Sequence, residues 1–373
     1  MKKQIAALGV ALLMMVGVAK AGLVEDGEAA YKRGDFETAL RVFRAAAAQG
    51  NSTAQYGLGV MYNTGQGVAT DPAEAVKWFR LAAEQGNALG QFNLGVMFLQ
   101  GRGIAKDPAE AVKWFRLSAL QGDAEAQNNL GMSYLHGQGV APDAAEAAKW
   151  FLLAAQQGIS HAQLTIGRMY NEGRGVAVNE GEAARWIRQA ADQGLDAAQY
   201  SLGVAYWGGK GVAKNMVEAV KWFRLAAKQG HVSALRRLGG LYEFGQAVEK
   251  DLNESIKWYE LAAAKQDVEA QEALGRVHGT IKNYPEAIKW WRLASAQGNG
   301  SSQFFLALMY VQGKAVAKDF VRGHMWASLA AEAGKDKAEK FRDEIAELLT
   351  PEQLAQSQQL ARDCRARRFK ECD

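Results

Sequence analysis

Apolar residues recur at the spacing of one helix face, twice in every stretch of about 36 residues. In the first stretch the two faces consist of Ala54, Leu58, Met61 and Tyr62, and then of Ala75, Trp78, Phe79 and Ala82. Between them lies Gly65-Gln66-Gly67-Val68, whose glycines permit a sharp reversal of the chain. The pattern therefore predicts two helices joined by a glycine-containing loop.

This helical pair is repeated along most of the chain, as a search for internal repeats shows. Eight units begin at Asn51, Asn87, Asp123, Ile159, Leu195, His231, Asp267 and Asn299, and all have 36 residues except the seventh, which has 32. One tryptophan occupies the same place in each unit: Trp78, Trp114, Trp150, Trp186, Trp222, Trp258, Trp290 and Trp326. The units depart from one another locally, because the seventh has lost its loop and Ala247 and Ala315 replace the second loop glycine.

Each second helix begins with a residue that can cap its free backbone N–H groups. Asp71 followed by Pro72 and Glu74 predicts a capping box with proline in the first turn. The same signal returns in the pairs Asp107 and Glu110, Asp143 and Glu146, Asn179 and Glu182, Asn215 and Glu218, Asp251 and Glu254, and Asn283 and Glu286. These periodic acids are therefore expected to cap helices rather than to act in catalysis.

The segments that flank the repeats have helical patterns of their own. Residues 22–50 predict an N-terminal helical capping unit, and residues 335–373 predict capping helices followed by a cysteine-containing tail. Thr350-Pro351-Glu352-Gln353 is a second capping-box signal. Such atypical ends are expected of a stack of repeats, whose terminal hydrophobic faces have no neighbouring repeat to cover them.

The units resemble Sel-one-like repeats, which are relatives of the tetratricopeptide repeat. The third unit shows the pattern in Ala126-Gln127, Leu130-Gly131, Tyr134, Gly137-Gln138-Gly139-Val140, Ala147, Trp150, Ala154-Ala155 and Gly158. The resemblance covers residues 51–334, and the motif is specific because eight units agree in phase. It implies an all-α, right-handed α/α superhelical solenoid of helix-turn-helix repeats that contacts other proteins, often in the bacterial cell envelope.

The N-terminus has the pattern of a secretory signal peptide. Two lysines precede an apolar run from Ile5 to Val18, and Ala19-Lys20-Ala21 predicts cleavage after Ala21. The alternative is an uncleaved anchor, but the run is shorter than the ~20 residues of a spanning helix. Residues 1–21 are therefore read as a signal peptide, the mature chain as lacking a transmembrane segment, and its location as periplasmic or secreted.

Composition narrows the function classes. Forty glycines among 373 residues exceed average usage, but 49% hydrophobic residues exclude a disordered chain and five prolines exclude collagen. Removing the three lysines of residues 1–21 lowers the formal charge from +4 to +1. Nothing in this charge favours nucleic acid as a partner.

No catalytic, metal-binding or cofactor motif stands out in the sequence. The five histidines, His136, His161, His231, His278 and His324, fall at five different places in the repeat and show no metal-ligand spacing. Ser-x-x-Lys and Gly-x-Ser-x-Gly are absent. We therefore expect no enzyme and no cofactor. A β-lactam-hydrolysing enzyme, as in the cysteine-rich branch of the resembled family, remains the less favoured alternative, since residues 22–363 contain no cysteine.

Cys364 and Cys372 are the only cysteines, and an exported chain favours a disulfide between them. Eight residues of continuous helix would separate them by about 12 Å of rise, so the chain must turn between Arg365 and Glu371 if they pair. A redox or metal-binding pair is the alternative. The basic residues of the same tail indicate a solvated end or, alternatively, a contact for an acidic partner or for lipid headgroups.

The first helix of each unit has a second face that the core does not require. Counted from the first residue of each unit, this face comprises positions 6, 10 and 13, where aromatic and apolar residues are common. The candidate partner-binding residues are Tyr56, Phe92, Tyr200, Trp207, Arg236 and Phe304. They either bind a partner or pack against the neighbouring unit. The sequence thus predicts a monomeric, non-catalytic scaffold that binds a protein or peptide through the concave face of the solenoid. The alternative is an envelope signalling regulator.

Overall fold

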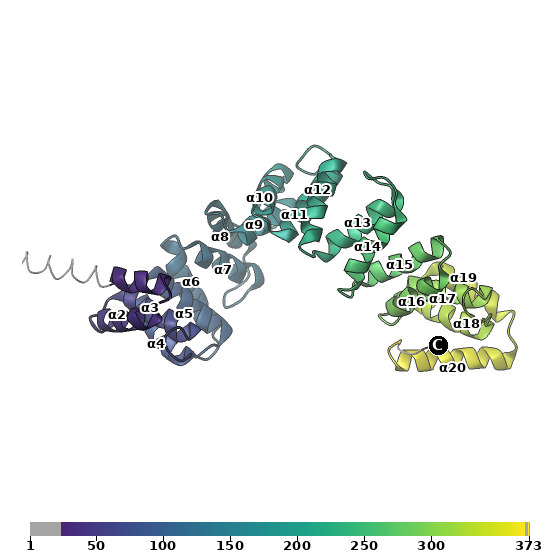
Figure 1. The fold of residues 1–373 in the computed structure, drawn as a ribbon, viewed down its shortest axis with the longest axis horizontal. Coiled ribbons are helices and arrows are strands. Elements are labelled where there is room, and N and C mark those ends of the chain that lie inside the picture. The colour runs from purple at the N-terminus through teal and green to yellow at the C-terminus, as the bar shows by residue number, and fades with distance from the viewer. Residues whose placement is uncertain (1–23, 370–371, 373) are drawn as a thin grey trace, which may run out of the picture. The chain divides into compact units, whose positions relative to one another are not determined.

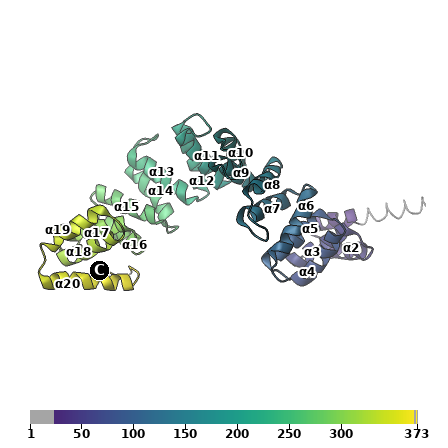
Figure 2. The same cartoon turned by 180° about the vertical axis from the view of Figure 1, so that it is seen from behind.

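The computed structural model describes residues 24–369 and residue 372. The predicted signal peptide, residues 1–21, lies outside the described residues. The described residues form helices joined by short loops, without a strand. The chain divides between Gln193 and Gly194 into two compact units. Within each unit the helices follow one another in chain order, and consecutive helices pack side by side (Figures 1 and 2).

Every repeat consists of two antiparallel helices of 12 or 13 residues. The first helices are α3 (Ser52–Thr64), α5 (Ala88–Gln100), α7 (Ala124–His136), α9 (Ser160–Glu172), α11 (Asp196–Gly208), α13 (Val232–Phe244), α15 (Val268–Thr280) and α17 (Gly300–Gln312). The second helices are α4 (Pro72–Glu84), α6 (Pro108–Leu120), α8 (Ala144–Gln156), α10 (Glu180–Asp192), α12 (Met216–Lys228), α14 (Leu252–Ala263), α16 (Tyr284–Ser295) and α18 (Phe320–Glu332). Flanking helices are α2 (Phe36–Ala48), preceded by a helical segment 24–32, and α19 (Asp336–Ala346) and α20 (Pro351–Ala366).

The loop between the two helices needs glycine for two separate reasons. Gly65 ends α3 in the left-handed conformation, with φ of 78°. Gly103 also has a positive φ, and a Cβ atom there would lie 2.3 Å from the carbonyl carbon of Pro72 in the preceding repeat. Ala247 and Ala315, which replace this second glycine, keep positive φ values of 60° and 57°. The loop conformation therefore survives the substitution, at the cost of a backbone strained for an L-residue.

The two helices of a repeat approach closely because a glycine of the first helix faces a ring of the second. A Cβ atom on Gly59 would lie 2.4 Å from the ring of Phe79, which is fully buried. The eighth repeat has alanine at both corresponding places, Ala307 instead of the glycine and Ala327 instead of the ring. The repeated glycine thus serves helix packing as well as chain reversal.

The repeated tryptophan is less buried than the helical periodicity predicts. Trp78 and five of its counterparts are half-buried, and only Trp186 and Trp326 are buried. The residue that completes the buried face of α4 is Val76, next to Ala75, Phe79 and Ala82. The prediction that Trp78 belongs to the buried face of α4 was wrong. The neighbouring helices cover only part of this face, and Trp78 lies at its edge.

The predicted N-caps are present, but the glutamates that accompany them act differently from the prediction. Asp71 accepts a hydrogen bond from the backbone N–H of Glu74 at 3.0 Å, whereas Glu74 pairs with Lys77 at 2.7 Å rather than with the cap. Asn283 makes no side-chain cap hydrogen bond, which corrects the expectation for the shortened repeat. Asp319 still caps α18 and pairs with Arg322, and Thr350 and Gln353 form the predicted capping box.

A ladder of buried glutamines, which the sequence analysis missed, fastens successive helices. Gln91 on α5 donates its side-chain amide to the backbone oxygen of Ala83, at the end of the preceding α4, across 3.1 Å. Its side-chain oxygen accepts from Gln121, at the end of the following α6, across 2.7 Å. The same bond between two glutamine side chains is present in Gln55–Gln85, Gln127–Gln157, Gln163–Gln193, Gln199–Gln229 and Gln271–Gln297. Each pair satisfies buried polar atoms, and the glutamines Gln55, Gln91, Gln127 and Gln163 also bond to the preceding helix, so that each of them links three helices.

The ladder is interrupted in two repeats. In the sixth, Leu235 and Lys265 occupy the two places, and Leu235 is buried in the apolar core. In the eighth, Gln303 remains, but Ala333 stands at the end of α18, and the buried Oε1 atom of Gln303 has no hydrogen-bond partner among the described residues. The two repeats therefore interrupt the ladder differently, one by apolar replacement and one by loss of a donor.

The C-terminal helix packs against the last repeat. Arg365 on α20 pairs with Glu332 on α18 at 2.7 Å, and Ser357 on α20 lies 2.6 Å from the ring nitrogen Nδ1 of His324 on α18. Helix α20 ends at Ala366, and Cys364 forms a disulfide with Cys372, as the two-cysteine pattern predicted. None of the described helices has the length and apolar character needed to cross a membrane.

Candidate binding surface

The candidate residues lie on one face of the first helices, which we call the first-helix face and define by positions 6, 10 and 13 of each repeat. Three hollows open on this face, and each is lined by at least one residue at position 6. One of these hollows lies between two repeats, and the other two lie where the first and last repeats meet the flanking segments.

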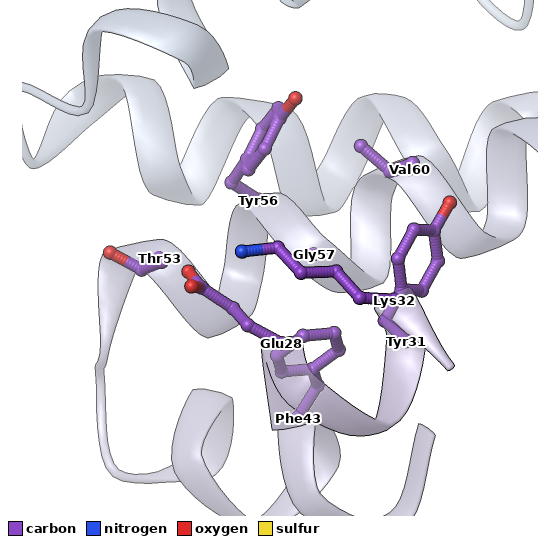
Figure 3. A pocket seen from close by; sticks show the side chains of 8 residues that line it. All are labelled: Glu28, Tyr31, Lys32, Phe43, Thr53, Tyr56, Gly57 and Val60. Atoms are coloured by element: carbon purple, nitrogen blue, oxygen red, sulfur yellow. The ribbon is translucent and has the colours of Figure 1, made fainter. Parts of the chain in front are cut away.

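The first hollow lies between α3, the first helix of the first repeat, and the helical segment 24–32 (Figure 3). It has a volume of about 280 Å³. Tyr56 and Val60 face it from α3, whereas Glu28 and Lys32 bring one charge of each sign to its rim. Gly57 leaves the space open, because a Cβ atom there would lie 2.9 Å from the ring of Phe43.

The middle hollow, of about 400 Å³, lies between α11 of the fifth repeat and α13 of the sixth repeat. Its lining includes Tyr200, Ser233, Arg236, Arg237, Phe244 and Gln246. The guanidinium carbon of Arg237 lies 4.7 Å from the centre of the Trp207 ring, within the range of a cation–π contact. Two predicted residues, Tyr200 and Arg236, thus line one hollow, and a third, Trp207, supports a residue that lines it.

The third hollow, of about 530 Å³, lies near the last repeat. Phe304 lines it together with Glu272 of α15 and Lys335. Phe304 also contacts Phe341 of α19 edge to face, with ring centres 5.6 Å apart. The structure therefore brings Phe304 both to the hollow and to the C-terminal helices.

The predicted residues also contact the core, so binding and packing are not exclusive alternatives at these positions. The rings of Tyr56, Phe92 and Tyr200 pack against Phe79, Phe115 and Phe223 of the paired second helices, with ring centres 6.0, 6.0 and 5.6 Å apart. All three side chains are half-buried. Replacing them by alanine would therefore reduce stability as well as any contact with a partner.

An ion pair between two positions of the first-helix face, Glu243 and Arg276, is specific to the sixth and seventh repeats. Glu243, which is only 6% exposed, pairs with Arg276 and accepts a hydrogen bond from the Tyr259 hydroxyl at 2.9 Å. Burial raises the pKa of Tyr259 well above its ordinary value, and the adjacent negative charge of Glu243 raises it further. Tyr259 takes the place of the phenylalanine of other repeats. The triad satisfies itself, so we read it as structural.

A fourth hollow, of about 390 Å³, lies between α18, α19 and α20 and includes His324, Ser328 and Arg342 in its lining. The contact between His324 and Ser357 has the atoms of a nucleophile–base pair. However, Ser357 is 0% exposed, so a substrate cannot reach its hydroxyl. This pair therefore fastens helices, and we assign it no chemistry. Among the described residues, no cluster of three or more His, Cys, Asp or Glu side chains could hold a metal ion.

Comparison with known protein families shows to which family the chain belongs. The Sel1 repeat matches eight segments: residues 52–87, 88–123, 124–159, 160–195, 196–231, 232–267, 268–299 and 300–335. The chain belongs to the Sel1 repeat family. Sel1 repeat proteins are generally scaffolds for protein interactions and are typically non-catalytic.

Two solved structures of Sel1 repeat proteins are similar over most of their length. One is c5321, a protective antigen present in uropathogenic Escherichia coli strains that displays an SLR fold. It is 30% identical, with a TM-score of 0.60, and the match covers 95% of this chain and 93% of c5321. The other is a Sel1 repeat protein from Oxalobacter formigenes, 34% identical, with a TM-score of 0.58, and the match covers 64% of this chain and 96% of that protein. No curated protein sequence matches the chain.

Proposed function

We propose that this Sel1 repeat protein is an exported, monomeric scaffold that binds a protein or an extended peptide through its first-helix face. The observation that carries the proposal is the recurrence of hollows on that face, each with an aromatic or charged residue at position 6. Aromatic and arginine side chains in concave sites contribute most of the binding energy in protein interfaces. The half-buried rings are held in place by the core, so little conformational entropy is lost when a partner binds.

Export is supported by two independent features of the chain. The N-terminal sequence has the charged, apolar and small-residue regions of a signal peptide, and the C-terminal tail carries a disulfide. The relative c5321 is a protective antigen. This property also fits an exported protein, since antibodies act outside the cytoplasm.

Site-specific photo-crosslinking in the source cells tests the binding face. Val204 on the first-helix face and Leu225 on a second helix are both 42% exposed, which makes them a matched pair in the second unit. Met132 and Leu153, 37% and 42% exposed, form the corresponding pair in the first unit. A photoreactive residue at Val204 or Met132 is expected to label one reproducible partner, whereas Leu225 and Leu153 are not. Equal labelling from both helices, or no partner from any position, would contradict the proposal.

A further inference from the structure

The inference concerns Arg237, which is charged at a place where the other repeats are neutral. The corresponding residues are Gly57, Asn93, Asn129, Thr165, Ser201, Ala273 and Phe305. Several of these bond back to their own helix, as Asn93 does to the carbonyl oxygen of Leu89 at 2.9 Å. Arg237, at position 7, therefore brings a positive charge to the middle hollow, next to the first-helix face, that the repeat itself does not require.

Nothing in the described part of the chain neutralises this charge. Arg237 contacts the rings of Trp207 and Phe223, with its guanidinium carbon 4.7 and 6.0 Å from their centres. Its Nε atom is buried without an acceptor, and no described carboxylate forms an ion pair with the side chain. The neighbouring Arg236, by contrast, pairs with Asp267 at 3.7 Å and with Glu269 at 3.2 Å. The two terminal nitrogens of Arg237 thus remain available to a ligand.

The surroundings of Arg237 form a site of defined shape and chemistry. The two arginines and the hydroxyl of Ser233 line the middle hollow, and Tyr200 and Phe244 supply aromatic walls. Gly240 leaves space in it, because a Cβ atom there would meet nothing closer than the Tyr259 hydroxyl at 3.5 Å. In three other repeats valine occupies this place: Val60, Val96 and Val204.

We propose that the middle hollow binds a carboxylate of the partner, with Arg237 as the residue that pairs with it. A guanidinium whose ring-stacked plane is fixed matches the two oxygens of a carboxylate, and such charge-assisted pairs are stronger than neutral hydrogen bonds. The aromatic walls favour an apolar side chain next to the carboxylate. The carboxylate belongs either to an aspartate or glutamate side chain or to a peptide C-terminus. This inference rests on the proposed partner-binding function and specifies the chemistry of the ligand.

Three short probes separate these sources. Acetyl-Phe-Glu-amide presents a side-chain carboxylate, acetyl-Gln-Phe presents a terminal carboxylate, and acetyl-Phe-Gln-amide presents neither. Titration of the full chain, followed through the ¹⁵N resonances of the arginine Nε–H groups, reports affinity and site together. We expect at least one carboxylate probe to bind about tenfold or more tightly than the neutral probe, and to shift the resonance that Arg237→Gln removes.

The variants are chosen so that folding and binding can be separated. Arg237→Gln should abolish the preference for carboxylate, whereas Arg168→Gln, an exposed arginine on the same face of α9, should not. Gly240→Val should block the hollow without unfolding α13, because valine is native at this place elsewhere and favours the helix over glycine. A circular-dichroism melt of each variant verifies that it is folded.

Three results would overturn the inference: equal affinity for the charged and neutral probes, an unchanged preference in a folded Arg237→Gln variant, or no binding of either carboxylate probe at millimolar concentration. If crosslinking from Val204 nevertheless labels a partner, the proposed function stands and only the carboxylate assignment fails. If crosslinking fails while the probes bind at Arg237, the carboxylate assignment stands and the proposed function fails.

Discussion

The side-chain amide of Gln121 donates a hydrogen bond to the side-chain oxygen of Gln91, 30 residues earlier, across 2.7 Å. Gln91 is buried, so its oxygen depends on this donor. Gln121→Ala is therefore expected to lower the free energy of unfolding by about 1–2 kcal/mol, because it leaves a buried acceptor unsatisfied.

A double-mutant cycle measures the pairing directly. Gln91→Leu with Gln121→Ala should cost less than the sum of the two single changes, since an apolar residue at this place is native in the sixth repeat as Leu235. Urea denaturation of the four proteins provides the free energies. Strictly additive costs would show that the two glutamines do not interact.

The eighth repeat offers the opposite experiment, because Gln303 already lacks its donor. Ala333→Gln restores a glutamine at the end of α18, where its amide can reach the buried Oε1 atom of Gln303. We expect the variant to gain about 1 kcal/mol in stability. Ala333→Leu, which has similar length but no amide, serves as the control. An equal gain in both variants would attribute the effect to packing.

The contact between Gly59 and Phe79 predicts a position that does not tolerate a methyl group. Gly59→Ala would place a Cβ atom 2.4 Å from the ring, and the strain is expected to cost about 1–3 kcal/mol despite the better helix propensity of alanine. Gly181→Ala in α10 is the matched control, because its nearest atom lies 3.5 Å away. Thermal melts should show a lower Tm for the first variant only.

Ala247 and Ala315 hold left-handed backbone conformations that glycine adopts without strain. Ala247→Gly should raise the free energy of unfolding by about 1 kcal/mol, since relief of strain exceeds the entropy that glycine adds to the unfolded chain. Ala69 lies in a loop but does not have a positive φ, so Ala69→Gly should leave the free energy of unfolding unchanged or lower it. Guanidinium denaturation checks both variants, and destabilisation by Ala247→Gly would argue against the loop conformation.

The packing of α20 on α18 is expected to depend on pH through His324. Burial lowers the pKa of His324 below its ordinary value of 6.5, and the positive charge of Arg342 lowers it further, although Asp343 opposes this shift. Below about pH 6.5 the unfolded chain therefore takes up a proton that the folded chain resists, so stability falls as the pH decreases.

Hydrogen exchange of α20 at pH 7.5 and 5.5 measures this effect. Protection should decrease at the lower pH in the native protein, and His324→Gln should reduce the difference. His278, whose pKa is also lowered by burial, leaves a smaller dependence in the variant, but that dependence belongs to α15 rather than to α20. An undiminished loss of protection in α20 would exclude His324 as its cause.

Much of the fold follows from the sequence because its signals are local. The caps at Asp71 and Thr350 and the reversal at Gly65 depend on residues within one turn of helix, and all three are present. The repeat period also identified the first-helix face, because side chains three or four residues apart share a face of a helix.

Other features depend on residues that are distant in the chain and could not be read in the same way. Gln91 looks like a surface residue until Gln121 and the carbonyl oxygen of Ala83 are placed around it. The charge of Arg237 is visible in the sequence, but that no carboxylate among residues 24–369 pairs with it is not. The half-burial of Trp78 likewise depends on how far the neighbouring helices reach, which no periodicity states.

The gap in the glutamine ladder at Leu235 has a consequence for cooperativity. In a linear array of repeats, stability is a sum of terms for single repeats and for their contacts with nearest neighbours. Because Leu235 and Lys265 do not form the amide link, the helices around Leu235 are joined by apolar packing. The middle hollow takes its lining from α11 and α13, on both sides of the contact between the fifth and sixth repeats. A carboxylate bound there would add a link between two neighbouring repeats at a place where the amide ladder is interrupted.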